Sequence, residues 1–209
     1  MRSIWMAVGA ALTLVVGGLV WAVMTHAGQA TDRAAADGVN SEIRTDALLE
    51  SGLLHFRHRD LPQAKAAFEH VLALDPENKL AWYNLGVLAQ DQGRGSDAHQ
   101  AYDAALKADS AYTSALFNKA LLLKASDPDK ALGLLRRAVA ADPKASTAHF
   151  HIGEILARKG REDEARNAYH RAVGLDPALR SQVPAAFRPA SGESAEAAVN
   201  SETEAGSPR

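Results

Sequence analysis

The chain has 209 residues, of which only 6% are aromatic, and its many Ala and Leu residues favour a helical body over a sheet. Its 23 basic residues are balanced by 25 acidic ones, for a formal net charge of -2, so no electrostatic surface for nucleic acid is expected. Because the chain has no cysteine, disulfides, a thiolate nucleophile, Cys-based zinc sites and acylation at cysteine are excluded.

A run without charged residues covers residues 4–24, directly after Arg2. As a helix, this run of about 21 residues would extend roughly 31 Å, close to the hydrocarbon thickness of a bilayer. Trp5 and Trp21 lie near its ends, where indole rings favour the headgroup level. We predict a transmembrane signal-anchor over residues 1–25. Because Arg2 and the amino terminus precede the span, the positive-inside rule places the N-terminus in the cytoplasm and the remaining chain outside it.

A cleaved signal peptide is the alternative for this segment, since Gly28-Gln29-Ala30 has the small-x-small pattern of a cleavage site. The mature chain would then be secreted. In either case residues 26–44, which are Ala-rich and weakly charged, are interpreted as a tether.

From residue 45 the sequence repeats itself with a period of about 34 residues. Four units follow: residues 45–78, 79–112, 113–145 and 146–179. Each contains two amphipathic helical stretches separated by a break such as Asp60-Leu61-Pro62 or Asp127-Pro128, and an Asp-Pro pair ends three of the four units. The pattern predicts helix-turn-helix units in which a small residue of the first helix, such as Gly86, lies opposite a small residue of the second, such as Ala98.

The third unit is one residue shorter than the others, and the deletion falls between Lys124 and Asp127. Asp127 is expected to cap the second helix, and Pro128 suits its first helical position. A tighter corner is therefore predicted here, and not a break in the array.

The units resemble the tetratricopeptide repeat family, whose pattern of aromatic, Leu-Gly, Tyr, Ala, aromatic, Ala and Pro they follow. The matching residues are Leu48, Gly52, Ala64, Phe68 and Pro76 in unit one; Trp82, Leu85, Gly86, Gly93, Ala98, Tyr102 and Ala105 in unit two; Leu116, Ala120, Ala131, Leu135, Ala138 and Pro143 in unit three; and Ile152, Gly153, Gly160, Ala165, Tyr169, Ala172 and Pro177 in unit four. Among the departures, Ala89 replaces the Tyr, Ser110 the Pro and His149 the Trp. The resemblance implies an all-α solenoid of four repeats, here preceded by the transmembrane or signal helix.

The resemblance also implies that a protein or peptide binds the concave face formed by the first helices. The fifth position of each unit would supply an apolar ridge, and polar residues would flank it. The candidate partner-binding residues are Leu49, Tyr83, Asn84, Gln90, Phe117, Asn118, Lys124, Phe150, Glu154 and Arg158. Packing between neighbouring first helices is the alternative role for the ridge. The Lys and Asn residues with which some family members grip a terminal carboxylate are missing from unit one, although Lys124 or Arg158 could hold a carboxylate differently.

The C-terminal residues divide into a short cap over 180–188 and a tail over 189–209. Leu179, Val183 and Phe187 are spaced to form one stripe, which Pro184 interrupts. The tail has a single large apolar residue, Val199, and is expected to be disordered.

No catalytic, metal or cofactor site is expected. His55 and His58 have helical spacing for a shared ion but no third ligand, and His149 and His151, two residues apart, point to different faces of a helix. Gln92-Gly93-Arg94-Gly95 lacks the Lys and the preceding strand of a phosphate-binding loop.

These features favour a membrane-anchored repeat scaffold outside the cytoplasm of a bacterial cell, of use in envelope assembly or secretion. Two alternatives remain: a secreted module that self-associates through its repeat ends, and an accessory subunit of a separate enzyme.

Overall fold

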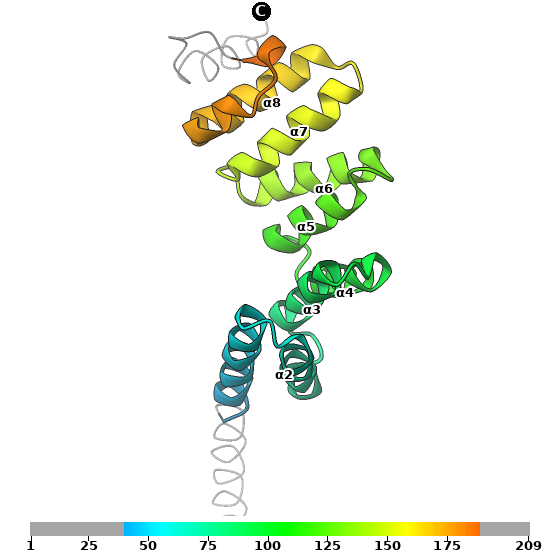
Figure 1. Ribbon diagram of the computed structural model, residues 1–209, viewed down its shortest axis with the longest axis vertical. Helices are drawn as coiled ribbons and strands as arrows, with labels where there is room; N and C mark the ends of the chain where they lie inside the picture. Colours follow the sequence, from blue (N-terminus) through cyan, green and yellow to red (C-terminus); the bar gives the residue numbers. More distant parts are fainter. Residues whose placement is uncertain (1–39, 189–209) are drawn as a thin grey trace, which may run out of the picture.

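The computed structural model describes residues 40–188, and within this range every regular element is helical (Figure 1). A helix over residues 40–57 comes first, so residues 40–44, assigned above to the tether, are helical. The α-helices that follow are α2 (Leu61–Leu74), α3 (Lys79–Asp91), α4 (Gly95–Ala108), α5 (Thr113–Leu123), α6 (Pro128–Ala141), α7 (Ser146–Arg158) and α8 (Glu162–Leu175). Two 3-10 helices, η1 (Pro177–Ser181) and η2 (Ala185–Phe187), end the described chain.

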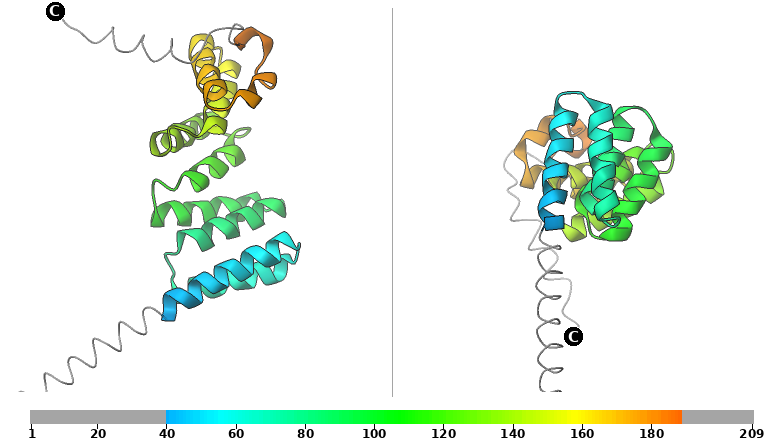
Figure 2. Two further views of the ribbon diagram at one scale, coloured as in Figure 1. Left: turned by 90° about the vertical axis from the view of Figure 1, so that its left-hand side faces the viewer. Right: turned by 90° about the horizontal axis from the view of Figure 1, so that it is seen from below.

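The helices pair in chain order and the pairs stack into an elongated array. Figure 1 and Figure 2 show the helix over residues 40–57 beside α2 at one end and α7 beside α8 at the other. The predicted all-α helix-turn-helix array is confirmed. None of the helices in residues 40–188 has both the length and the apolar character needed to cross a bilayer. The span predicted over residues 4–24 lies outside the described residues.

The connection between successive units is an aspartate turn. Asp75, Asp109, Asp142 and Asp176 each end a second helix in an extended conformation. The Oδ1 atom of each accepts a hydrogen bond from the backbone N–H two residues later, at 3.2, 3.0, 3.0 and 3.0 Å respectively. Ser110 follows Asp109 without changing this turn. The repeated Asp therefore holds the turn, and the Pro that usually follows it is dispensable.

The shortened turn of unit three has the predicted helix cap. The side chain of Asp127 accepts a hydrogen bond from the N–H of Lys130 at 3.0 Å, and Pro128 begins α6. Units two and four instead end their first helices at Gly93 and Gly160, both with φ of 71°. In unit one the same position holds Arg59 in the same left-handed conformation, with φ of 63°.

Within a unit, the two helices meet where an aromatic ring lies over a glycine. A Cβ atom added to Gly52, Gly86 or Gly153 would lie 2.5, 2.5 or 2.8 Å from the nearest ring carbon of Phe68, Tyr102 or Tyr169. The ring therefore fills the space that a side chain at the glycine would need. In unit three the same two positions hold Ala120 and Leu135, both fully buried. The smaller Leu side chain leaves room for the methyl group that the ring excludes.

We predict that Gly86→Ala lowers the free energy of unfolding by about 1–3 kcal/mol, because the new methyl group overlaps Tyr102. Adding Tyr102→Leu gives an Ala and Leu pair like that of unit three. The double variant should lose less free energy of unfolding than the sum of the losses in the two single variants. Urea denaturation measures both. Gly133→Ala on α6 is the control: no atom lies within 4 Å of its added Cβ, so it should stabilise by about 0.5–1 kcal/mol. Equal effects of Gly86→Ala and Gly133→Ala would contradict the packing role of the ring.

Candidate functional site

Contacts between successive first helices bring several of the predicted binding residues together. Asn118 on α5 donates a hydrogen bond to the Tyr83 hydroxyl on α3 at 3.0 Å. Between α5 and α7, the Phe117 and His151 rings are 5.6 Å apart. We call the surface formed by the helix over residues 40–57 and by α3, α5 and α7 the first-helix face.

The four residues of the predicted apolar ridge differ in exposure. Leu49 and Phe150 are almost fully buried, and Phe150 packs edge-on against Tyr169 at 5.4 Å. Tyr83 and Phe117 are only half-buried. The inner ridge residues Tyr83 and Phe117 are therefore accessible to a partner, whereas Leu49 and Phe150 mainly hold neighbouring helices together.

Tyr83 is fixed from several directions. Its ring packs edge-on against Tyr112 at 5.3 Å and lies 6.1 Å from the Tyr102 ring, while its hydroxyl accepts the hydrogen bond from Asn118. Burial raises the pKa of Tyr83, so its hydroxyl stays protonated at neutral pH and retains a proton to donate to a ligand. A pre-positioned aromatic side chain binds with little loss of conformational entropy.

Two predicted amides differ in their surroundings. Asn84 donates to the carbonyl of Leu80 in its own helix at 2.8 Å, and Gln90 accepts from the Tyr102 hydroxyl at 2.8 Å. Gln90 is therefore tied to the joint between α3 and α4. Of the three amides on this face, Asn118 is the one that connects two units.

A charged cluster occupies the part of the face between α5 and α7. Lys124 Nζ lies 2.8 Å from Glu154 Oε2 and 3.3 Å from His151 Nδ1, and His151 Nδ1 lies 2.5 Å from the same carboxylate oxygen. Arg158, at the end of α7, donates to the Lys124 carbonyl at 3.3 Å. Burial raises the pKa of Glu154, but the hydrogen bonds from Lys124 and His151 outweigh it, so its pKa lies below the usual range and the carboxylate is charged.

His151 is a member of this cluster that was absent from the predicted binding residues. A signal for it was present in the sequence, because His151 occupies the same position in unit four as Asn84 and Asn118 in units two and three. Two exposed leucines, Leu53 and Leu80, also belong to the first-helix face. They make its unit-one end apolar, whereas Lys124, Glu154 and Arg158 make its unit-four end charged.

The two histidines of α7 point to different faces, as predicted. His149 is buried, and its Nε2 lies 3.2 Å from the Pro143 carbonyl. Trp82, at the same position of unit two, donates its indole N–H to the Pro76 carbonyl at 2.8 Å. His149 therefore replaces the Trp of the repeat pattern as the group that fastens the first helix to the preceding turn.

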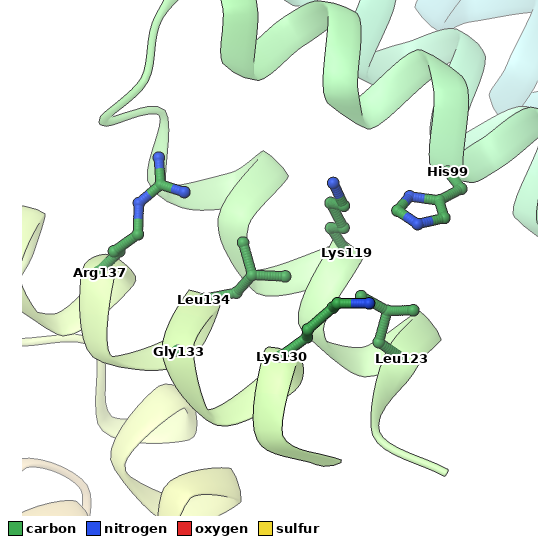
Figure 3. Close-up of a pocket in the computed structure, with 7 residues that line it drawn as sticks. All are labelled: His99, Lys119, Leu123, Lys130, Gly133, Leu134 and Arg137. Carbon is green, nitrogen blue, oxygen red and sulfur yellow. The ribbon is translucent and has the colours of Figure 1, made fainter. Parts of the chain in front are cut away.

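A hollow lies between α4, α5 and α6 (Figure 3). It measures about 330 Å³ and is lined by His99, Lys119, Leu123, Lys130, Gly133, Leu134 and Arg137. The three permanent cations have partners: Lys119 pairs with Asp103, Lys130 with Asp127, and Arg137 donates to the Ser110 carbonyl. An anionic ligand would have to replace these contacts, so we do not assign a site to this hollow.

Among residues 40–188, no three His, Cys, Asp or Glu side chains are grouped so that they could hold a metal ion. His55, one of the two histidines considered for a metal, lies 3.5 Å from Asp60 at the end of the first helix.

Comparison with known proteins places this geometry in a family. The tetratricopeptide repeat family model matches residues 49–113, 86–123 and 121–179, which together cover more than half of the chain. The chain belongs to the tetratricopeptide repeat family.

Three similar solved structures have the same fold. The structure described as "Functional Characterization of Pseudomonas Aeruginosa pilF" has a TM-score of 0.63 and 20% identity, covering 79% of this chain and 72% of that one. A crystal structure of MamA has a TM-score of 0.58 and 21% identity, covering 66% and 81%. YrrB, described as a TPR protein with an unusual peptide-binding site, has a TM-score of 0.55 and 22% identity, covering 66% and 74%. At these identities the likeness shows the fold alone.

Two curated relatives are named as glycosyltransferases. The chain is 32% identical over 124 residues to the "Probable UDP-N-acetylglucosamine--peptide N-acetylglucosaminyltransferase SPINDLY" of Hordeum vulgare, and 31% identical over 109 residues to the "Protein O-mannosyl-transferase Tmtc3" of Drosophila melanogaster. These matches cover 59% and 51% of this chain but only 12% of each relative. The names therefore describe proteins of which this chain matches a small part.

The buried His149 predicts a specific pH dependence of stability. Burial lowers its pKa below the ordinary value of 6.5, although the hydrogen bond with the Pro143 carbonyl opposes this shift. As the pH falls below 6.5, the unfolded chain takes up a proton that the folded chain resists, so stability present above pH 6.5 is lost on acidification, by at most about 1.4 kcal/mol per pH unit.

His149→Trp should make the free energy of unfolding less dependent on pH between 7.5 and 5.5, because Trp keeps the donor and cannot be protonated. Urea denaturation at the two pH values measures the difference. His70→Gln, on the exposed surface of α2, is the matched control and should leave the dependence as in the original chain. An unchanged slope in His149→Trp would show that His149 does not contribute to it.

Proposed function

We propose that this tetratricopeptide repeat protein is a membrane-anchored scaffold that binds a protein segment on its first-helix face, outside the cytoplasm. The family and its similar structures support protein or peptide binding as the general function. The observation that carries the proposal is the pair of half-buried aromatic residues, Tyr83 and Phe117, on neighbouring first helices. Aromatic side chains held in place by their neighbours are the residue type that dominates binding energy at protein interfaces.

The distribution of polarity along the face selects the kind of segment that it would bind. At the unit-one end, Leu53 and Leu80 expose aliphatic side chains to solvent. Towards the unit-four end, the face has two cationic side chains, Lys124 and Arg158, and one anionic side chain, Glu154. We therefore favour an amphipathic segment with aliphatic side chains towards units one and two, and a carboxylate towards Arg158, because Lys124 is already paired with Glu154.

The anchored, extracytoplasmic location rests on residues 4–24, a run without charged residues between Trp5 and Trp21, and on the basic residue before it. With this orientation the repeat array would face the cell envelope, where assembly and secretion machinery requires scaffolds. A role as the accessory subunit of a separate enzyme is the second candidate, and the names of the two curated relatives favour a glycosyltransferase as that enzyme.

A photoreactive benzoylphenylalanine at Phe117 should form a covalent adduct with one dominant partner protein when cells are irradiated, because this half-buried side chain lies on the first-helix face. The same residue at Gln100 on α4 or Asn167 on α8, both exposed, is the matched control. We expect the Phe117 adduct to be absent at both control positions. Mass spectrometry of the adduct identifies the partner. An equal adduct at Gln100, or no adduct at Phe117 while a control position captures the partner, would place the binding surface elsewhere.

The anchor makes a separate prediction about the location of the chain. The full-length protein should sediment with membranes, remain there after alkaline carbonate extraction and retain its first residues, as read by mass spectrometry. Protease added to spheroplasts should digest the repeat array. Recovery of a soluble chain that lacks about its first 30 residues would instead establish the cleaved signal peptide, whose apolar core is usually shorter than this run.

A further inference from the structure

The N-terminal end of the array presents an apolar stripe that no described element covers. Ile43, Ala47, Ser51 and Leu54 lie on one side of the helix over residues 40–57, at spacings of four, four and three. Ile43 is 61% exposed and Leu54 is 45% exposed. The view from below in Figure 2 looks onto this end, where the helix lies beside α2. We call these four residues the N-terminal stripe.

The equivalent positions of the other units show the packing role of Ala47 and Leu54 in the N-terminal stripe. Leu88 and Ile155, at the position of Leu54 in units two and four, are 1% and 0% exposed. Ala81, Ala115 and Ala148, at the position of the exposed Ala47, are completely buried. In those units the preceding helix pair covers the stripe, because α3 packs on α2, α5 on α4 and α7 on α6. Ala47 and Leu54 are thus at helix-packing positions that lack a covering helix among residues 40–188, and Ile43 extends the stripe by one turn before the first unit.

The opposite end of the array is closed, which limits what a second copy could contact. Leu179 and Val183 are buried in the core of units three and four, and the Phe187 ring lies 5.6 Å from that of Tyr169. The segment containing η1 and η2 therefore occupies the surface on which a following unit would pack, and a second copy cannot stack head to tail there. Among residues 40–188, the N-terminal end is the end of the array that leaves its helix-packing side chains exposed.

The order of residue sizes in the N-terminal stripe is symmetric: large, small, small, large. When two such helices pack antiparallel across a two-fold axis, Ile43 of one lies against Leu54 of the other, and Ala47 lies against Ser51. The small central residues allow the helices to approach closely, and the large outer ones cover the contact at both ends. We propose that the N-terminal stripe is the interface of a symmetric head-to-head dimer of this chain.

The oligomeric state of the full-length chain in mild detergent tests the proposal. Analytical ultracentrifugation should show a dimer, and Ile43→Glu should raise its dissociation constant at least about tenfold, because the interface would bury an unpaired carboxylate. Leu175→Glu on α8 is the matched control: Leu175 is 44% exposed but lies away from the stripe, and this variant should remain dimeric. A monomeric original chain, whether the stripe is free or covered by residues 1–39, would overturn the proposal. An unchanged dimer in Ile43→Glu would do the same.

The orientation is tested with single cysteines, since the chain has none of its own. Ala47→Cys and Ser51→Cys chains, when mixed and oxidised, should form the mixed disulfide faster than either forms a disulfide with itself. Ala140→Cys on the exposed surface of α6 should form none. Faster self-linked disulfides at both stripe positions would indicate parallel helices and contradict the antiparallel packing of the N-terminal stripes.

Discussion

The close contact between a glycine and an aromatic ring determines how near the two helices of units one, two and four can approach, and the rest of the array depends on this distance. The ring carbons of Phe68, Tyr102 and Tyr169 occupy the space that a side chain on the facing glycine would need. Tyr102 also contacts two residues of the first-helix face: its hydroxyl donates a hydrogen bond to Gln90, and its ring lies beside that of Tyr83. One residue of the packing core thereby positions two residues of the first-helix face, so the geometry of the face follows from the packing within the unit.

The aspartate turns and the ion pairs set how one unit follows the next. Each turn satisfies a backbone N–H that would otherwise be unpaired, and it does so with a side chain only two residues away. Pairs such as Arg59 with Asp91 then cross the junction on the surface, at 2.6 Å in this case. Exposed pairs of this kind contribute little to stability, so the apolar contacts carry the energy of each junction and the polar contacts fix its register.

Much of the fold was predictable from the sequence because similar residue types recur at the same positions of successive units. Asp127 and Pro128 identified a helix start from local chemistry alone, and the structure has it there. The contact of Gly86 with the Tyr102 ring could not be read from spacing, since which side chain fills a gap depends on the angle at which the helices cross. The same limit applies to the site. His151 and Glu154 are three residues apart on α7, but both meet Lys124 of α5 only through the packing between units three and four, which no single repeat contains.

The junction between units two and three differs physically from its neighbours, and it lies at the centre of the proposed binding face. At the position where unit four buries Ile152 and unit two has Leu85, unit three has Lys119, which pairs with Asp103. Leu122 and Leu123 are only partly buried there, and the hollow of about 330 Å³ opens beside them. In a linear array each junction is stabilised by its own contacts, so the least apolar junction opens at the lowest free energy. Tyr83 and Phe117 lie on opposite sides of it. The hydrogen bond from Asn118 to the Tyr83 hydroxyl crosses this junction, so the packing between units two and three sets the separation of the two aromatic side chains.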